Sequence, residues 1–418
     1  MEDNKTVSGG FRFRFHPRIL GTPAPVFPGF EIDISDQVPD SEKPDAVWHR
    51  QRARKMLQSH PEIKSIMGNT QSTAIWCVLV CLLQQSLAVA AGWLPIWAIP
   101  IVAYVVGSIL NINLFMLAHE CNHNLVFKSE PANRWLFTLT SLPMFLSGHH
   151  TWWIEHHVHH SDLGAKKDFI KRRRSFFLIT RTRNLFGLSK GRVHHVLSGL
   201  VTPLFVPYAL IMLVTQVIRS ALGLIVYFFV NLLRGQLLPG KLALTILADE
   251  HLVSGYERYR TKHWAVLYPL LSLTMIGLLF WLVGWQAVLY LLLSALFATG
   301  FLHPLLLGMI LSNSHFHGHK RYQPSASYYG WLNYITFNFG YHTEHHDLCR
   351  VPWSALPKLT RMAPEFFDDL LQTKSYIGLA LLYAFASPEK YEQDFDSEEH
   401  RNREMVQEHD AAKEVGAA

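Results

Sequence analysis

Cysteine is scarce in this chain, and its few positions exclude the disulfide framework of a small secreted protein. Four cysteines occur among 418 residues, and they show no paired spacing. Two of them, Cys77 and Cys81, lie within one apolar run, whereas Cys121 and Cys349 stand apart. We therefore expect all four to be free, reduced thiols.

The sequence also lacks a recognisable secretory signal and a basic nucleic-acid face. Its first stretch alternates large apolar and charged residues from Phe11 to Phe15 and contains no continuous apolar core. The formal net charge of +6 is modest, and the basic residues as a whole are not arranged with aromatics as on a nucleic-acid-binding surface. We expect no nucleic-acid partner, and membrane insertion has to rely on internal segments.

Long apolar runs dominate the sequence instead. Four runs approach the roughly 20 residues that cross a hydrocarbon core about 30 Å thick, so we expect transmembrane helices at about 73–94, 96–117, 264–285 and 287–311. Two further apolar stretches are less suited to crossing. Residues 135–146 are too few and should be re-entrant or interfacial, whereas 196–233 are interrupted by Pro203, Pro207 and Arg219 and should lie along the membrane surface.

Charge and proline define the flanking regions. Residues 1–44 form a polar, proline-rich arm, residues 45–386 a membrane domain that starts with an amphipathic helix at about 45–67, and residues 387–418 a charged tail. The segment 166–192 is strongly basic, and basic loops favour the cytoplasmic side.

Histidine is abundant, with 24 residues, and three clusters have a regular spacing. They are His119-Glu-Cys-Asn-His123, His156-His-Val-His159-His160 and His342-Thr-Glu-His345-His346. Residues three and four positions apart share one face of a helix, so each cluster can aim two or three imidazoles at one point. If the intervening stretches cross the membrane an even number of times, all three clusters meet at its cytoplasmic face.

The number of imidazoles indicates two metal ions. Imidazole suits iron, zinc, copper and nickel, so ligand type alone leaves the metal open. A tetrahedral zinc takes about four donors, whereas the clusters offer eight candidate ligands: His119, His123, His156, His159, His160, His342, His345 and His346. Of the nearby His315, His317 and His319, we expect His315 to complete the shell of the second ion.

These features predict an all-α integral membrane fold. Four transmembrane helices would form two hairpins, and a cytoplasmic helical cap would hold the histidine-rich dimetal site. A site at the mouth of a membrane bundle faces lipids, whose unactivated C–H bonds resist acids, bases and nucleophiles. Activation of molecular oxygen at the metal pair is the chemistry that such a substrate requires.

Two interpretations from other classes stay open at this point. Residues His119 to His123 also match the His-Glu-x-x-His pattern of zinc proteases, with Glu120 as the general base, although the other two clusters would then have no role. In the dimetal interpretation Glu120 would instead bond the second ring nitrogen of a ligand. A non-catalytic protein that binds lipid or stores metal would leave lipid composition unchanged when its metal is lost.

The same residues resemble the membrane fatty acid desaturase superfamily, and longer phrases resemble its sphingolipid Δ4-desaturases, or dihydroceramide desaturases. The phrases are His49 to Gly68, Ser327 to Asp347, and Leu356-Pro357 with Phe367-Asp368-Asp369, within a resemblance that covers about 45–386. The sequence departs from the family pattern at Val158, where an acidic residue is usual, and in the histidine-rich stretch Ser312 to Pro324.

The resemblance implies a non-haem diiron enzyme with O2 as co-substrate. Its ligands would be the eight candidate histidines of the three clusters, which are called the box histidines below. Electrons would come from NAD(P)H through a separate cytochrome b5-type or ferredoxin-type donor. The reaction would remove hydrogen from carbons 4 and 5 of the sphinganine base of dihydroceramide and leave a trans double bond. The location would be the endoplasmic reticulum in a eukaryote or the cytoplasmic membrane in a bacterium. An acyl-lipid desaturase and a sphingoid-base C4-hydroxylase remain alternatives.

Overall fold

Helices form nearly all the regular structure of the protein. The computed structural model describes residues 44–146, 149–163, 205–247, 255, 262–298, 303–312, 324–368, 370 and 372–385. Within these ranges the structure is helical apart from loops and one isolated bridge between Ser327 and Gln372, which confirms the predicted all-α class. The basic segment 166–192 and the predicted ligand candidates His315, His317 and His319 lie outside the described residues, as do nearly all of the arm and the whole tail.

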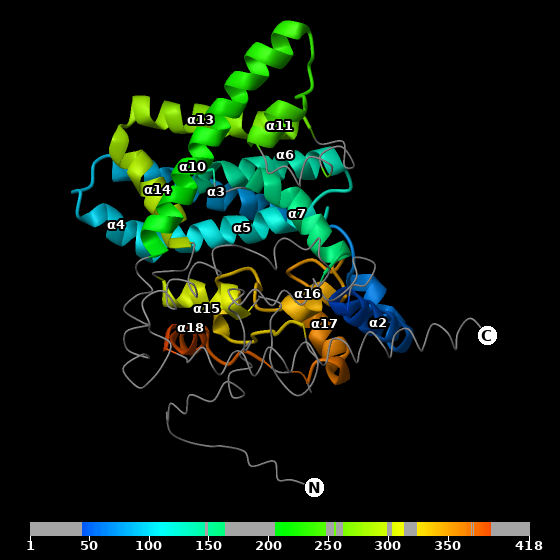
Figure 1. The fold of residues 1–418 in the computed structure, drawn as a ribbon. Helices are drawn as coiled ribbons and strands as arrows, with labels where there is room; N and C mark the ends of the chain where they lie inside the picture. The colour runs from blue at the N-terminus through cyan, green and yellow to red at the C-terminus, as the bar shows by residue number, and fades with distance from the viewer. Residues whose placement is uncertain are drawn as a thin grey trace.

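The helices stack in two layers (Figure 1). The first layer contains α3 (Thr73–Ala91), α4 (Ala98–Val102), the π-helical turn η3 (Ala103–Gly107), α5 (Ser108–Asn122), α6 (Glu130–Ser141) with η4 (Leu142–Met144), α10 (Phe205–Val226) with its extensions η6 (Tyr227–Asn231) and η7 (Leu232–Arg234), α11 (Lys241–Leu247), α13 (Trp264–Leu282) and α14 (Trp285–Ala298). The second contains α2 (Pro44–Ser59), η2 (Pro61–Ile66), α15 (Pro304–Ser312), η8 (Trp331–Tyr334), α16 (His342–Asp347), α17 (Leu356–Met362), η9 (Pro364–Phe366) and α18 (Tyr376–Phe385). Helix α7 (His149–Ser161) runs from the first layer toward the second.

Four described helices are long and apolar enough to cross a membrane. They are Thr73–Ala91, Ala98–Asn122, Leu213–Arg234 and Trp264–Leu282. Three correspond to predicted spans, but Leu213–Arg234 was expected to lie along the membrane surface. Pro207 stands in the first turn of α10, where a missing N–H is tolerated. Arg219 donates from Nε to the carbonyl of Ile246 at 3.0 Å, so its polar head is satisfied by protein.

The predicted span at 287–311 is not one of these four helices. Its residues belong to α14 and α15, which have 14 and 9 residues and are separated by the undescribed residues 299–302. Helix α14 packs on α3 and α5 in the first layer, whereas α15 packs on α18 in the second. Each helix alone is shorter than the roughly 20 residues of a crossing. The crossing at 287–311 stays a prediction.

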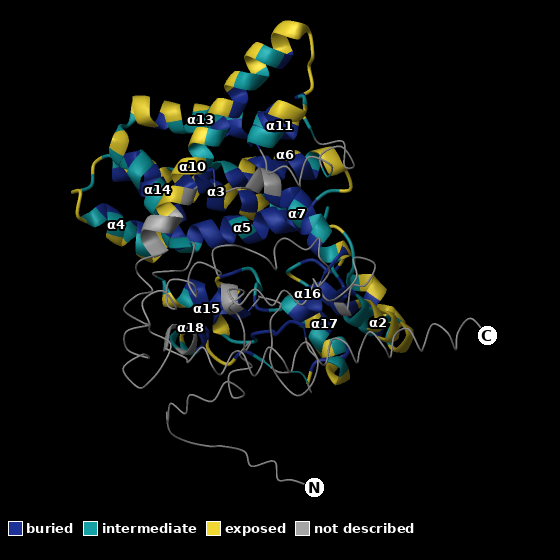
Figure 2. Ribbon diagram, in the orientation of Figure 1, coloured by how far each residue is buried: buried dark blue, intermediate teal, exposed yellow. Residues whose placement is uncertain are grey.

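The apolar helices expose large side chains that would be costly in water. On α13, Phe280, Trp281 and Leu282 are 59%, 78% and 68% exposed, and the end of this helix is largely exposed in Figure 2. Contiguous apolar exposure of this kind indicates contact with another apolar phase. Together with the four apolar helices, it identifies a membrane protein.

The expected amphipathic helix at 45–67 is divided by a proline. Helix α2 ends at Ser59, and Pro61 begins the short helix η2. Met56 and Ile63 are fully buried and pack against residues around α16 and α17, including Leu359 and Phe367. The N-terminal helices thus support the segment that carries the third histidine cluster.

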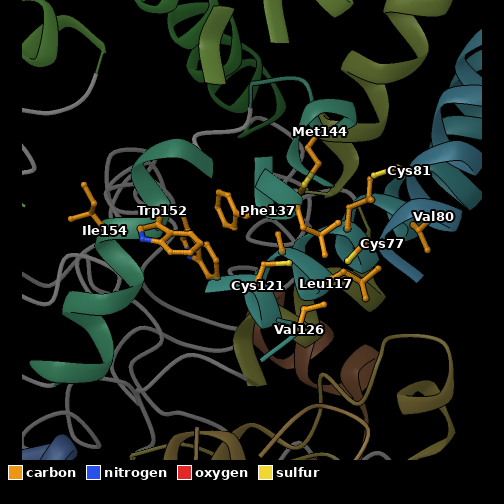
Figure 3. Packing of buried hydrophobic residues seen from close by; sticks show 14 of the residues in the cluster. Cys77, Val80, Cys81, Leu117, Cys121, Val126, Phe137, Met144, Trp152 and Ile154 are labelled. Atoms are coloured by element: carbon orange, nitrogen blue, oxygen red, sulfur yellow. The ribbon is translucent and has the colours of Figure 1, made fainter. Parts of the chain in front are cut away.

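A dense apolar core joins the helices that carry the first two histidine clusters. Figure 3 shows Cys77 of α3, Cys121 of α5, Phe137 of α6 and Trp152 of α7 in one packed group. The ring of Trp152 stacks parallel to that of Phe137, with centroids 6.2 Å apart. All four cysteines are free, as predicted. This packing sets the relative positions of α5 and α7.

Candidate metal centre

Five histidines from all three clusters converge at one place. His119 and His123 lie at the end of α5, His156 and His160 on α7, and His345 on α16. Each offers a ring nitrogen within 4.8 Å of the others. The spacing of four residues places both members of each helical pair on one face, as the sequence predicted. The donor set therefore joins the two layers of helices.

The nitrogen separations within this group fit a shared metal ion. The Nε2 atoms of His123 and His156 are 2.8 Å apart, and those of His345 and His160 are 3.1 Å apart. Two imidazoles bound at right angles through bonds of about 2.0–2.1 Å would have nitrogens about 2.9 Å apart. Nδ1 of His119 is buried and has no hydrogen-bond partner among the described residues. A buried nitrogen of this kind calls for a ligand, and a metal ion would supply one.

The electrostatics of the group also suit metal binding. Burial, reinforced by the neighbouring imidazoles, holds the pKa of His123, His156, His160 and His345 well below the usual 6.5. These rings are therefore neutral at physiological pH, and a neutral imidazole offers the lone pair that a metal requires.

The remaining three box histidines gather around His346, beside the first group. The ring centroid of His346 lies 4.3 Å from that of His160, 4.5 Å from that of His342 and 5.1 Å from that of His159. His160 thus borders both groups. The structure therefore brings together all eight candidate ligands of the three clusters. They form a first set of His119, His123, His156, His160 and His345 and, beside it, a second set of His159, His342 and His346.

Glu120 connects the first cluster to the loop that follows the third. Its Oε2 accepts the backbone N–H of Trp353 at 3.0 Å, and the side chain is buried. Its other oxygen is 3.8 Å from Nδ1 of His119, beyond hydrogen-bond length. The expected hydrogen bond to a ligand's ring nitrogen is therefore not formed. Glu120 therefore holds the loop at Trp353 through a hydrogen bond. This structural role differs from that of a general base in a protease.

Glu344 anchors α16. Its carboxylate accepts hydrogen bonds from Ser327 at 2.6 Å, Tyr329 at 2.5 Å and Thr360 at 3.3 Å. Burial raises the pKa of Glu344, and the hydroxyl donors oppose that shift. These contacts fix the helix that carries His345 and His346.

Asp347 ties the end of α16 to α2. Its Oδ1 is 2.7 Å from Nδ1 of His49, and its Oδ2 is 3.0–3.1 Å from nitrogens of Arg52. The ring of His49 lies 5.2 Å from that of His346, which places a histidine outside the three clusters beside the centre. Reasoning from spacing missed His49 because it belongs to no cluster. The one available signal was its position at the start of the phrase His49 to Gly68.

Comparison with known proteins agrees with this arrangement. Residues 91–377 match the fatty acid desaturase family. The chain is 30% identical to a Drosophila melanogaster protein named sphingolipid delta(4)-desaturase DES1, with 81% of this chain and 88% of the relative covered. It is 29% identical to human sphingolipid delta(4)-desaturase/C4-monooxygenase DES2, with the same coverage, and 28% identical to a rice DES1-like desaturase, with 80% and 85% covered.

No solved structure matches the chain significantly. The family match spans the first and third histidine clusters and everything between them, so it includes all the box histidines that converge in the structure. We conclude that the chain belongs to the fatty acid desaturase family and is a lipid desaturase.

Proposed function

We propose that this chain is a sphingolipid Δ4-desaturase that introduces the trans Δ4 double bond into the sphingoid base of dihydroceramide. The observation that carries the proposal is the convergence of imidazoles from α5, α7 and α16 where the apolar helices meet the second layer. The substrate is inferred from the relatives, whose names specify sphingolipid delta(4)-desaturation over about four fifths of this chain.

We assign two iron ions to the two adjoining histidine sets. The proposed ligands are His119, His123, His156, His159, His160, His342, His345 and His346, with His315 as a further donor. Bound iron would supply the O2 activation that removal of hydrogen from an alkyl chain requires. The neutral imidazoles and the nitrogen separations described above support a divalent ion at the first set.

Aromatic side chains separate the first set from the core of the bundle. Trp152 stacks on His156 with ring centroids 4.4 Å apart, and Phe115 packs on Trp152 at 4.7 Å. These rings orient the imidazole and exclude water from its apolar side. A saturated lipid chain is compatible with such a wall, whereas a peptide substrate would leave its backbone groups without hydrogen bonds.

The proposed setting is a membrane supplied with reducing equivalents by another protein. Electrons would come from NAD(P)H through a separate cytochrome b5-type or ferredoxin-type donor. The centre would face the cytoplasm, as the basic segment 166–192 favours. The membrane would be the endoplasmic reticulum in a eukaryote and the cytoplasmic membrane in a bacterium.

Hydroxylation at carbon 4 is the second candidate, because the name of the human relative includes C4-monooxygenase. Desaturation and hydroxylation share the first hydrogen removal and differ in whether a second hydrogen leaves or oxygen is transferred. The products differ in mass and in their fragments, so one experiment separates them.

The test is expression in a host that lacks Δ4-unsaturated sphingoid bases, followed by lipid mass spectrometry. We expect a new trans Δ4 double bond with the wild type and none with His345→Ala. A 4-hydroxylated base alone would favour the hydroxylase. New acyl double bonds with unchanged sphingoid bases would overturn the proposed substrate, and one zinc ion per purified chain would contradict the diiron centre.

A further inference from the structure

His49 has an environment unlike that of an ordinary buried histidine. It lies on α2, far in sequence from the clusters, yet it is only 3% exposed and its ring is 5.2 Å from that of His346. The ring contacts that His346 makes with histidines of the clusters span 4.3–5.4 Å between centroids. Two imidazoles bound to one ion through bonds of about 2.0–2.1 Å have centroids about 4.5–5.5 Å apart. His49 therefore lies where a ligand of the second set would lie.

The orientation of His49 is set by a carboxylate. The short contact of 2.7 Å between Nδ1 and Oδ1 of Asp347 requires a proton on Nδ1, because the carboxylate only accepts. In the neutral ring the lone pair is then on Nε2, the nitrogen farther from Asp347. A histidine that donates one ring N–H to a carboxylate and offers the other nitrogen is the arrangement found around protein-bound metals.

Charge balance does not require this hydrogen bond. Arg52 already contacts both oxygens of Asp347, with Nε at 3.1 Å from Oδ2 and 3.4 Å from Oδ1. The guanidinium neutralises the carboxylate and is itself held by the carbonyl of Phe366 at 2.6 Å. The contribution of His49 is therefore a fixed ring beside His346.

We propose that His49 is a protein ligand of the second iron ion, with Asp347 and Arg52 as its positioning residues. The proposal rests on the diiron centre proposed above and extends its donor set beyond the histidine clusters. It would make α2 part of the metal centre, in addition to α5, α7, α16 and the segment that carries His315.

The decisive variant is His49→Asn, with iron per chain measured on the purified full-length protein. The amide nitrogen of asparagine can occupy the place of Nδ1 and keep the hydrogen bond to Asp347, but no atom replaces Nε2. We expect about two ions in the wild type and about one in His49→Asn. Release of the remaining ion to a chelator should be unchanged.

His60→Asn is the matched control. His60 follows α2 in the same N-terminal region, and its ring is bonded to Glu62 and Glu365 at the surface. This variant should keep both ions. His49→Gly provides a second measurement should asparagine disturb the fold, because added imidazole should restore the second ion there and change nothing in a His60→Gly protein.

The outcomes separate the two proposals. Two ions in both the wild type and His49→Asn, with equal chelator release, would overturn the role of His49 and leave the diiron centre intact. Fewer than two ions in the wild type would overturn both. One ion in His49→Gly that imidazole does not raise to two would also contradict ligation by His49.

Discussion

The Nε2 atoms of His123 and His156 lie 2.8 Å apart, although 33 residues separate them along the chain. The helices that carry the two rings, α5 and α7, share a packed core that includes Leu117 and Trp152. The close approach is therefore a property of the folded scaffold. Variants of these histidines can therefore test which side chains hold metal.

Replacement of His156 by alanine should remove an ion from the first set. We expect about half the iron of the wild type and a loss of desaturation of about 100-fold or more. His157→Ala is the control on the same helix, because the ring of His157 lies against Trp153 at 5.5 Å. Iron content and product formation together check the prediction, and equal losses in the two variants would contradict it.

Glu120 should respond differently to glutamine and alanine. Glutamine keeps an oxygen that can accept the N–H of Trp353, so Glu120→Gln should retain its iron and nearly all its activity. Glu120→Ala leaves that buried N–H without its acceptor and should lower the free energy of unfolding by about 1–3 kcal/mol. Thermal unfolding in detergent measures the difference. A stable Glu120→Gln protein that keeps its iron but has lost desaturation would show that Glu120 does more than hold the loop at Trp353.

Gly107 should tolerate no side chain. A Cβ at this position would overlap Oγ of Ser294 on α14 and would lie 2.8 Å from the hydroxyl of Tyr290. We expect Gly107→Ala to reduce the free energy of unfolding by about 1–3 kcal/mol. Gly277 on α13 has open space around its Cβ position, so Gly277→Ala should be neutral or stabilising by up to ~1 kcal/mol.

Unfolding of the detergent-solubilised proteins tests this pair. The double variant Gly107→Ala with Ser294→Gly should regain part of the lost stability, because the overlapping hydroxyl is removed. No rescue by Ser294→Gly would show that the overlap with the hydroxyl of Ser294 is not the cause, and a destabilised Gly277→Ala would show that the loss is not specific to the contact at Gly107.

The hydrogen bond between His60, directly before η2, and Glu365 of η9 should weaken as pH rises. The hydrogen bond to Glu365 raises the pKa of His60, and His60 in turn lowers the pKa of Glu365. Raising a histidine pKa in the folded state stabilises that state below the unfolded pKa of about 6.5, and the contribution is lost as pH rises through the raised value. Because the pKa of Glu365 is lowered in the folded protein, the contribution of Glu365 to stability is lost as pH falls through that lowered value. The effect should be small and salt-sensitive, because the pair is exposed.

Hydrogen exchange of residues 60–66, corrected for its intrinsic pH dependence, should therefore become faster between pH 6 and 9. His60→Gln should abolish the pH dependence while leaving the iron content unchanged. Identical exchange profiles in the two proteins would contradict the assignment.

The spacing of the histidines predicted that the three clusters converge. The pattern of cysteines predicted that they are free, and the apolar runs predicted three of the four candidate spans. Spacing works for His119 and His123 because helical geometry places them on one face whatever surrounds them. It fails where tertiary contacts decide. The polar head of Arg219 is satisfied by the carbonyl of Ile246, and the proximity of His49 to His346 depends on Asp347, 298 residues further along the chain. A sequence pattern contains neither distance.

The acidic residues in or directly after the first and third clusters make contacts with other protein groups. Glu120 accepts a hydrogen bond from the loop at Trp353, Glu344 accepts hydrogen bonds from three hydroxyl groups, and Asp347 forms an ion pair with Arg52. Contacts within the protein thus hold the imidazoles, and the five-histidine group contains no acidic oxygen from the residues that the structure describes. By the Irving–Williams order such a set of imidazoles binds copper or zinc more tightly than ferrous iron. Correct metallation in the cell therefore depends on which ions are available when the chain folds.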